Sequence, residues 1–414
     1  MSLVNQPFDG QLGDILSEKL QQNYNRLTIV VAFARNSGVL RLKPEIERFR
    51  ANGGTVHIFV GVDIQGTSYE ALKNLLPLCD SLYVVHSEDS ATTFHSKVFL
   101  LENDTGIWMA VGSNNLTGGG LWTNFESFVC QECAKGTPET IALLTPFSEL
   151  IARYSNANCE YSRRIEHEND VYELERSGYL VREVRQHIDQ NQERKRKAQA
   201  GIRALFGCPQ KARLPKVLVR APTKAQVGRT VQVRRGEIVH ATHAIGETNN
   251  NERIWFETRR LTGGSRNILD LSKLGTVTDG TGAGSRYETD DPRYILGGVA
   301  FFDIEPENIG VIKDITVNYD GIDYAPCTIK FATNNGSWRI QMKGQSVNGG
   351  TAIQSVNGTG WLVNKILVFE KIRTDYYALS ILEPEYLPAC QAASYVVAHN
   401  GSTRDSKEYG LFNT

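Results

Sequence analysis

Residues 94–126 read FHSKVFLLENDTGIWMAVGSNNLTGGGLWTNFE. In this stretch, His95 and Lys97 are two positions apart, so on an extended strand both side chains emerge on the same face. An imidazole is a competent nucleophile toward a phosphodiester, and a neighbouring ammonium can neutralise a non-bridging phosphate oxygen. These two residues are therefore the first candidates for a reaction centre.

The second half of the stretch offers groups that could hold an oxyanion. A predicted strand ends at Gly112-Ser113-Asn114-Asn115, and the glycine run 118–120 follows. The hydroxyl and amide groups, together with backbone N–H groups of the glycine run, can complete a cradle for phosphate oxygens. Glu126 lies at a distance suited to orient an imidazole through a hydrogen bond.

Together these residues resemble the signature of the phospholipase D superfamily, which is His-x-Lys, four residues, Asp, and then Gly-Ser-x-Asn. The sequence matches it at residues 95–97 and 112–115 and differs at Glu102, where the family has Asp; Asp104 lies two residues further on. The acid at that position is chiefly structural in the family. The alternative interpretation of Glu102 and Asp104 is polarity at a hairpin turn, and both interpretations stay open.

The resemblance implies a role for each matching residue and an α/β sandwich, in which a mixed sheet is flanked by helices. His95 would be the nucleophile that forms a phosphohistidine, and Glu126 would position it. Lys97 and Asn115 would hold phosphate oxygens, with Ser113 in support. No cofactor or metal is expected, since histidine and lysine supply what a divalent ion would otherwise supply.

The reaction needs one histidine to attack and a second to protonate the leaving oxygen. The chain has eight histidines but no second His-x-Lys motif. His57 and His86 lie in predicted α/β elements without partners, and we expect them to be surface or packing residues. His240 and His243 lie in a β-rich region without a suitably spaced lysine. The simplest resolution is a homodimer in which two copies of His95 meet across a two-fold axis.

Strands and helices alternate over residues 1–160, which predicts a layered α/β domain. The predicted strands are Arg26–Ala34, Val56–Val62, Leu82–Val85, Lys97–Leu101 and Trp108–Val111, and the predicted helices are Pro44–Asn52 and Tyr69–Leu76. Within this domain, Cys130 and Cys133 form a C-x-x-C pair. Because a second pair and a histidine cluster are missing, the pair does not predict a zinc site.

A charged segment follows at 161–212, where apolar residues recur at helical spacing, and it predicts a helical connector. Its basic run Arg194-Lys195-Arg196-Lys197 is either a solvated helix face or a stripe that contacts phosphates.

Short strands separated by Gly, Asn and Asp turns fill residues 213–414, which indicates a β-barrel or sandwich. The predicted strands are Lys216–Arg220, Thr230–Val233, Arg253–Glu257, Gly298–Phe302, Thr328–Ala332, Trp338–Met342, Leu362–Lys371 and Tyr376–Ile381. A single phospholipase D motif followed by an all-β region is similar to restriction endonucleases of the BfiI and NgoFVII type. The resemblance implies a dimeric N-terminal domain that cuts double-stranded DNA and a C-terminal B3-like pseudobarrel that reads its sequence.

Base reading requires donors such as arginine and lysine on loops or arms. The candidates are Arg220, Lys224, Arg229, Arg234, Arg235, Arg259, Arg260 and Arg266, each of which could also be ordinary surface charge. The resemblance further suggests a separate ATP-dependent helicase-like subunit. The chain has no phosphate-binding G-x-x-x-x-G-K-[ST] loop, so such a partner would have to supply ATP hydrolysis.

The bulk composition is that of a globular protein of two or three domains. Of the 414 residues, 41% are hydrophobic and 22% are charged, and the net charge of −1 provides no global basic field. No apolar run approaches the roughly 20 residues of a membrane span, and the N-terminus lacks a signal-peptide pattern, so we expect a cytoplasmic protein.

Two other functions remain to be weighed against a nuclease. A lipid-directed phospholipase D-type phosphodiesterase would need a membrane-docking element and usually carries two motifs in one chain. A non-catalytic DNA-binding module on the same fold would not need the complete motif set.

Overall fold

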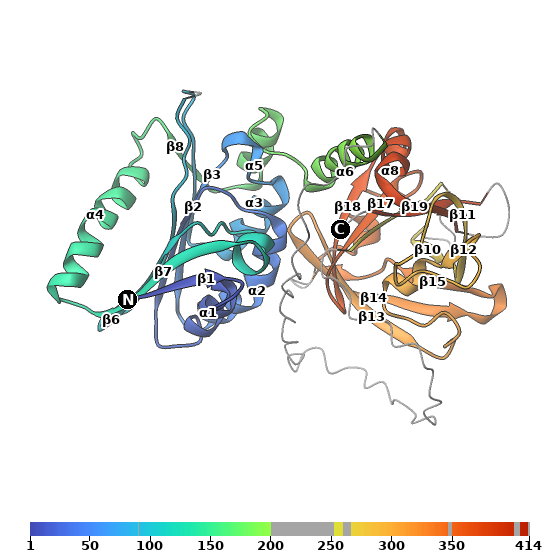
Figure 1. Ribbon diagram of the computed structural model, residues 1–414, viewed down its shortest axis with the longest axis horizontal. Coiled ribbons are helices and arrows are strands. Elements are labelled where there is room, and N and C mark those ends of the chain that lie inside the picture. Colours follow the sequence, from blue (N-terminus) through green and yellow to red (C-terminus); the bar gives the residue numbers. More distant parts are fainter. Residues whose placement is uncertain (90, 200–251, 260–265, 347–349, 401–405, 413–414) are drawn as a thin grey trace.

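The computed structural model describes residues 1–89, 91–199, 252–259, 266–346, 350–400 and 406–412. Figure 1 shows two bodies, a mixed sheet with helices on both faces and a second body built mainly of strands. None of the described helices is both long enough and apolar enough to cross a bilayer.

The first body is built on an eight-stranded mixed sheet, which confirms the predicted α/β class. In spatial order its strands are β1 (Ser2–Gln6), β7 (Glu126–Ala134), β6 (Gly106–Gly112), β5 (Lys97–Glu102), β2 (Arg26–Val31), β3 (Thr55–Gly61), β4 (Ser81–Val85) and β8 (Ser162–Ile165). The neighbours β2, β3 and β4 are parallel, and every other adjacent pair is antiparallel. The central strand β2 is a buried apolar run, as expected for a strand covered on both faces.

Helices α1 (Leu12–Lys19), α2 (Asn36–Ala51) and α3 (Tyr69–Leu75) pack on one face of this sheet. Helix α4 (Pro138–Tyr154) lies on the opposite face, away from the second body (Figure 1). Short turns of helix occur at Asp63–Gln65, Leu76–Leu78 and Gly119–Thr123.

Helix α2 begins eight residues before its predicted start at Pro44, which instead lies inside the helix. The side chain of Arg35, the residue before the helix, makes no capping hydrogen bond. The amide of Asn36 donates to the carboxylate of Glu183, which is 147 residues away in the sequence. The local sequence therefore carries no sign of where this helix starts.

The predicted helical connector is divided between the two bodies. It begins with strand β8, which pairs with β4 in the first sheet, so its first residues are not helical. Helices α5 (Glu168–Arg176) and α6 (Glu183–Gln199) follow. Leu174 and Leu180 belong to the core of the first body, whereas Val184 and Ile188 pack with the second body, so the division falls near residues 180–184.

The second body contains a twelve-stranded sheet, in agreement with a separate all-β C-terminal region. The strands, in spatial order, are β10 (Ile268–Leu271), β15 (Ser337–Gln341), β14 (Ile322–Ala332), β13 (Ile312–Tyr319), β18 (Tyr376–Leu382), β17 (Ile366–Arg373), β9 (Arg253–Glu257), β20 (Glu408–Phe412), β19 (Ser394–His399), β11 (Leu274–Gly280) and β12 (Tyr294–Leu296), with β16 (Gln345–Ser346) beside β14. Among the described strands of this second sheet, only β13 and β18 pair in parallel. No pairing within the described ranges joins β10 to β12, so the pseudobarrel stays a prediction.

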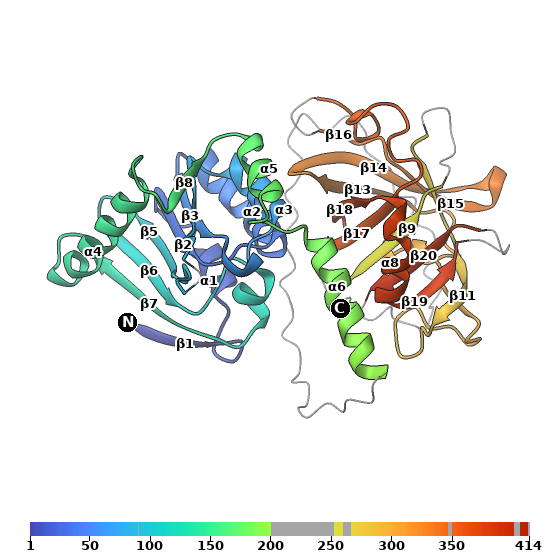
Figure 2. The same cartoon turned by 90° about the horizontal axis from the view of Figure 1, so that it is seen from above.

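Most predicted strands of this region coincide with observed ones, and β9 matches its predicted bounds. The prediction for Gly298–Phe302 is wrong, because residues Gly298–Phe301 form helix α7. This short run is buried throughout, and a buried apolar run of five residues does not distinguish a strand from a helix. A second short helix, α8 (Leu387–Ala393), packs beside α6 (Figure 2). The predicted strands Lys216–Arg220 and Thr230–Val233 lie outside the described residues.

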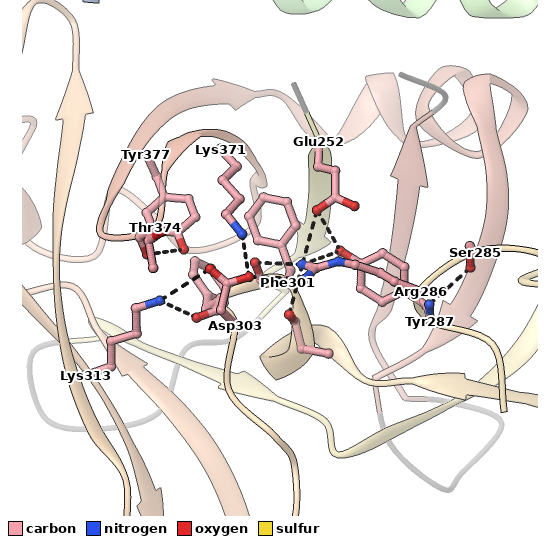
Figure 3. A network of polar contacts seen from close by, with 12 residues as sticks. Glu252, Ser285, Arg286, Tyr287, Phe301, Asp303, Lys313, Lys371, Thr374 and Tyr377 are labelled. Atoms are coloured by element: carbon pink, nitrogen blue, oxygen red, sulfur yellow. Dashed lines mark hydrogen bonds and ion pairs between the residues drawn. The ribbon is translucent and has the colours of Figure 1, made fainter. Parts of the chain in front are cut away.

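A buried ionic network ties several elements of the second body together (Figure 3). The Arg286 guanidinium lies 3.1 Å from both Glu252 and Asp303. Asp303 also pairs with Lys371 on β17 and with Lys313 on β13, where burial lowers the lysine pKa to about 8. Each buried charge thus has a partner of opposite sign, which offsets its desolvation.

Candidate active site

One end of the first sheet gathers the residues of the predicted reaction centre. His95 comes two residues before the start of β5, Ser113 and Asn115 follow the end of β6, and Glu126 begins β7. Because β5, β6 and β7 are adjacent and antiparallel, the start of β5, the end of β6 and the start of β7 meet at the same edge. The structure therefore brings together the elements that carry all five predicted catalytic residues.

His95 and Lys97 are held close together but differ in exposure. The His95 side chain is exposed, and its ring makes an edge-to-face contact with Phe33 at a centroid distance of 5.9 Å. Lys97 is 7% exposed, and its ammonium donates to the His95 backbone carbonyl at 2.7 Å. Burial lowers the pKa of Lys97, and the negative charge of Glu126 opposes this shift.

Glu126 is engaged with polar groups of neighbouring strands and loops. Its carboxylate accepts hydrogen bonds from the Ser113 hydroxyl and from the Asn124 amide, the latter at 3.1 Å. The Ser113 hydroxyl also accepts the Ser127 backbone N–H. Within the described part of a single chain no hydrogen bond joins Glu126 to His95, so its role in orienting the imidazole stays a prediction.

Asn115 is oriented by its amide oxygen, which accepts the backbone N–H of Phe33 at 3.1 Å. With the oxygen fixed in this way, the two N–H donors of the side chain point away from Phe33. An amide presented in this orientation suits a ligand that accepts hydrogen bonds, such as a phosphate oxygen.

Two amides of the glycine run 118–120, which the sequence suggested for an oxyanion cradle, donate to other groups of the chain. The Gly118 amide donates to the Ser37 hydroxyl, and the Gly120 amide donates to the Thr117 hydroxyl. A Cβ at Gly120 would lie 2.5 Å from the Asn115 carbonyl oxygen. Glycine is needed at position 120 for this close approach. The Gly118 amide ties the loop to α2 and the Gly120 amide bonds within the loop, so these two amides are not available to a phosphate.

Gln6 organises the loop before Glu126, and the sequence did not indicate it. Its side chain is 1% exposed, donates toward the carbonyls of Gly119, Gly120 and Asn124, and accepts the Leu12 N–H. A single glutamine carries no signal of such a role, because the carbonyls to which it donates lie more than 100 residues away.

Asp63 fixes the other flank of the site. Its carboxylate accepts the backbone N–H of Phe94, next to His95, at 2.6 Å, and it also bonds the His86 ring. His86 therefore holds the segment before His95 indirectly, instead of being an ordinary surface residue. His57 lies on β3 with its ring bonded to Ser81, which agrees with a packing role.

The remaining candidates of the first body lie elsewhere. Glu102 is at the far end of β5, where it faces Arg26 and Lys135, and Asp104 lies in the turn before β6. Both positions fit the interpretation of these acids as polar residues of a hairpin turn. Cys130 and Cys133 are three positions apart on β7, which directs their side chains to opposite faces of the sheet.

Only two of the proposed base-reading residues are described, and both have a positive φ. Arg259 pairs with Glu257 at 2.6 Å, and Arg266 is exposed. Arg220, Lys224, Arg229, Arg234, Arg235 and Arg260 lie outside the described residues, as do His240 and His243. The basic run 194–197 is on α6, where Lys197 pairs with Glu193.

Taken together, the site combines an exposed imidazole with a buried ammonium, an oriented amide and a hydroxyl–carboxylate pair. This set can attack a tetrahedral phosphorus centre and hold its oxygens. It defines a candidate phosphodiesterase half-site.

No family model matches the sequence, and no curated protein matches it. Among solved structures, the chain is similar to Nuc, a phospholipase D family member from Salmonella typhimurium, with 15% identity, a TM-score of 0.30, and coverage of 40% of this chain and 97% of Nuc. It is also similar to phosphatidylserine synthase of Haemophilus influenzae Rd KW20, with 14% identity, a TM-score of 0.33, and coverage of 48% of this chain and 46% of the synthase. A third similar structure is NucT from Helicobacter pylori, with 12% identity, a TM-score of 0.29, and coverage of 36% of this chain and 94% of NucT. Because the identities and TM-scores are low, these likenesses do not by themselves assign an activity.

Proposed function

We propose that the chain is a metal-independent endonuclease that hydrolyses phosphodiester bonds of double-stranded DNA through a phosphohistidine. The observation that carries the proposal is the gathering of His95, Lys97, Ser113, Asn115 and Glu126 at one edge of the sheet. His95 attacks phosphorus and displaces one strand end, whose oxygen takes a proton from a second imidazole. Water then cleaves the phosphorus–nitrogen bond and releases His95.

Cleavage of plasmid DNA in excess EDTA tests this activity, with His95→Ala as the control. Cleavage that survives chelation and disappears in the variant supports the proposal. Hydrolysis of phosphatidylcholine without DNA cleavage would favour the lipid-directed alternative, and DNA binding without either reaction would favour the non-catalytic module.

The second imidazole would come from a second copy of the chain. Support comes from helix α4, whose large apolar side chains are only half-buried against the sheet and whose Ile141 is 56% exposed. On the same side of the sheet, Val111 and Leu3 are 46% and 63% exposed, in register with the intervening Val129 of β7. This face points away from the second body, so a partner could cover it without a clash between C-terminal regions (Figure 1).

Subunit mixing tests the shared site. Wild-type protein is mixed with increasing amounts of His95→Ala protein under conditions that allow exchange. If each site needs both histidines, activity falls with the square of the wild-type fraction. A linear fall would mean that each chain works alone.

The C-terminal sheet would read the DNA sequence, as in a restriction enzyme, and an ATP-dependent helicase-like subunit could act beside it. Run-off sequencing of cut plasmid should then give a defined recognition site, whereas scattered ends would mean cutting without recognition. Co-purification of a motor protein, or stimulation of cutting by ATP in its presence, tests the partner, and failure of both would leave a self-sufficient enzyme.

A further inference from the structure

The connector contacts the first body at the N-terminal ends of α2 and α3. Val181 forms a parallel bridge with Ser68, and its carbonyl accepts the Tyr69 N–H at 3.0 Å. Glu183, the first residue of α6, accepts the Asn36 N–H at 2.5 Å and the Ser68 hydroxyl at 2.6 Å. One carboxylate oxygen thus joins the start of α2 to the residue that caps α3.

The segment 33–36 leads from this contact to the reaction centre. Its four successive backbone amides donate to three other parts of the chain, which are residues 115–116, Thr67 and Glu183. The acceptors are Asn115 Oδ1 (3.1 Å, from Phe33), Thr67 Oγ1 (3.0 Å, from Ala34), the Leu116 carbonyl (3.0 Å, from Arg35) and Glu183 Oε1 (2.5 Å, from Asn36). The segment is therefore clamped between Asn115 at one end and Glu183 at the other.

We propose that Glu183 is a positioning residue for the reaction, acting through segment 33–36 to fix the side chain of Asn115. The inference rests on the proposed phosphodiesterase function for its catalytic consequence. Without this carboxylate, the first amide of α2 and the Ser68 hydroxyl lose their acceptor at a helix N-terminus, where negative charge is favourable. The segment then keeps its bonds to Asn115, Thr67 and Leu116 but loses the one at its α2 end, and the donors of Asn115 are less well oriented.

The same residue begins the helix that belongs to the second body. Val184 and Ile188 of α6 pack with Trp255 on β9, and Gln192 donates to the Ala389 carbonyl on α8. A shift of the C-terminal region on binding DNA would consequently move Glu183 and reach Asn115 through the four amides. Cutting would in this way be tied to recognition.

The first part of the test uses the full chain and three variants, two at Glu183 and one at Lys43. Glu183→Ala removes the acceptor, whereas Glu183→Gln keeps an oxygen at the position where both hydrogen bonds end. Lys43→Met is the matched control, because it breaks the 2.6 Å ion pair with Asp323 between the two bodies without touching segment 33–36. The readouts are amide hydrogen exchange over 33–36 and steady-state hydrolysis of bis(4-nitrophenyl) phosphate.

In Glu183→Ala we expect exchange over 33–36 to accelerate and kcat to fall about tenfold, with little change in KM, the loss expected for a charge-assisted hydrogen bond. Lys43→Met should resemble wild type, and Glu183→Gln, which keeps the acceptor but loses the negative charge, should lie between wild type and Glu183→Ala. Adding Glu183→Ala to Asn115→Ala should lower kcat no further, because both changes act on the same side chain.

Unchanged exchange in Glu183→Ala, or an equal effect of Lys43→Met on both readouts, would overturn the inference. So would faster exchange with wild-type kcat. If the wild-type protein and His95→Ala are equally inactive, the proposed function fails, and hydrogen exchange alone still decides whether Glu183 holds the segment next to Asn115.

Discussion

At the scale of single residues, the site depends on two opposing effects on Lys97. The residue is 7% exposed, and burial lowers its pKa, while the charge of Glu126 acts in the other direction. Lys97 is useful to a phosphate only while it carries its proton. Glu126 therefore helps to keep the ammonium charged, in addition to its hydrogen bond with Ser113.

Glu126→Gln should accordingly shift the alkaline limb of the pH–rate profile to lower pH. Removing the negative charge leaves burial unopposed, so Lys97 loses its proton at a lower pH. The profile is measured with bis(4-nitrophenyl) phosphate. Glu102→Gln, at the opposite end of β5, is the control and should leave the limb in place. An unmoved limb in Glu126→Gln would show that this charge does not support Lys97.

Gln6→Ala should destabilise the first body by about 1–3 kcal/mol, because it leaves the buried Leu12 N–H without its acceptor and removes a shared donor from three carbonyls of the 119–124 loop. Denaturant unfolding measures the loss. Gln21→Ala removes an exposed side-chain hydrogen bond to Ser17 and should change stability by less than about 0.5 kcal/mol. Equal effects of the two substitutions would contradict a special role for Gln6.

At the scale of elements, the sequence predicted those strands and helices whose form depends on nearby residues. The strands Lys97–Leu101 and Trp108–Val111 were predicted because buried strands and their turns are encoded within a few residues, and they correspond to β5 and β6. Strand β7, which begins at Glu126, was not predicted. The start of α2 and the roles of Gln6 and Asp63 were missed, because their partners are distant in sequence. Long-range hydrogen bonds leave no periodic signal.

Helix α4 gives a prediction at this scale. Ile141 is 56% exposed on α4, and Ile141→Asp should weaken self-association and lower DNA cleavage together if this face meets a second copy. Analytical ultracentrifugation and the plasmid assay measure the two effects. The matched control is Ile312→Asp on β13, where the isoleucine is 60% exposed in the second body. Dimers that persist in Ile141→Asp would place the contact elsewhere.

At the scale of the whole molecule, the two bodies meet through buried polar groups as well as through the connector. Asn74 donates to Asn36 at 2.8 Å and accepts from Asn318 of β13 at 3.1 Å. Nearby, burial and the charge of Glu183 raise the pKa of Glu70 to about 7, while Arg182 opposes the shift. The interface therefore contains a carboxyl group that is more stable when protonated.

The stability of this interface should depend on pH through Glu70. Because the pKa is raised in the folded state, the contribution of Glu70 is fully present below its ordinary value near 4.5 and is lost as the pH rises through about 7. The melting temperature should fall over this range, and Glu70→Gln should flatten the profile. Glu18→Gln, an exposed carboxylate of α1, should keep the wild-type slope. Parallel profiles for wild type and Glu70→Gln would rule out this contribution.

The pairing of β1 with β7 has a consequence for biosynthesis. Gln6 lies opposite Glu126, so the two halves of this pairing leave the ribosome 120 residues apart. At about 5–20 residues per second, β1 waits roughly 6–24 s for its partner strand. The loop that Gln6 organises cannot be in place earlier, so a nascent chain that has not yet reached β7 carries the histidine and lysine without the groups that complete the reaction centre.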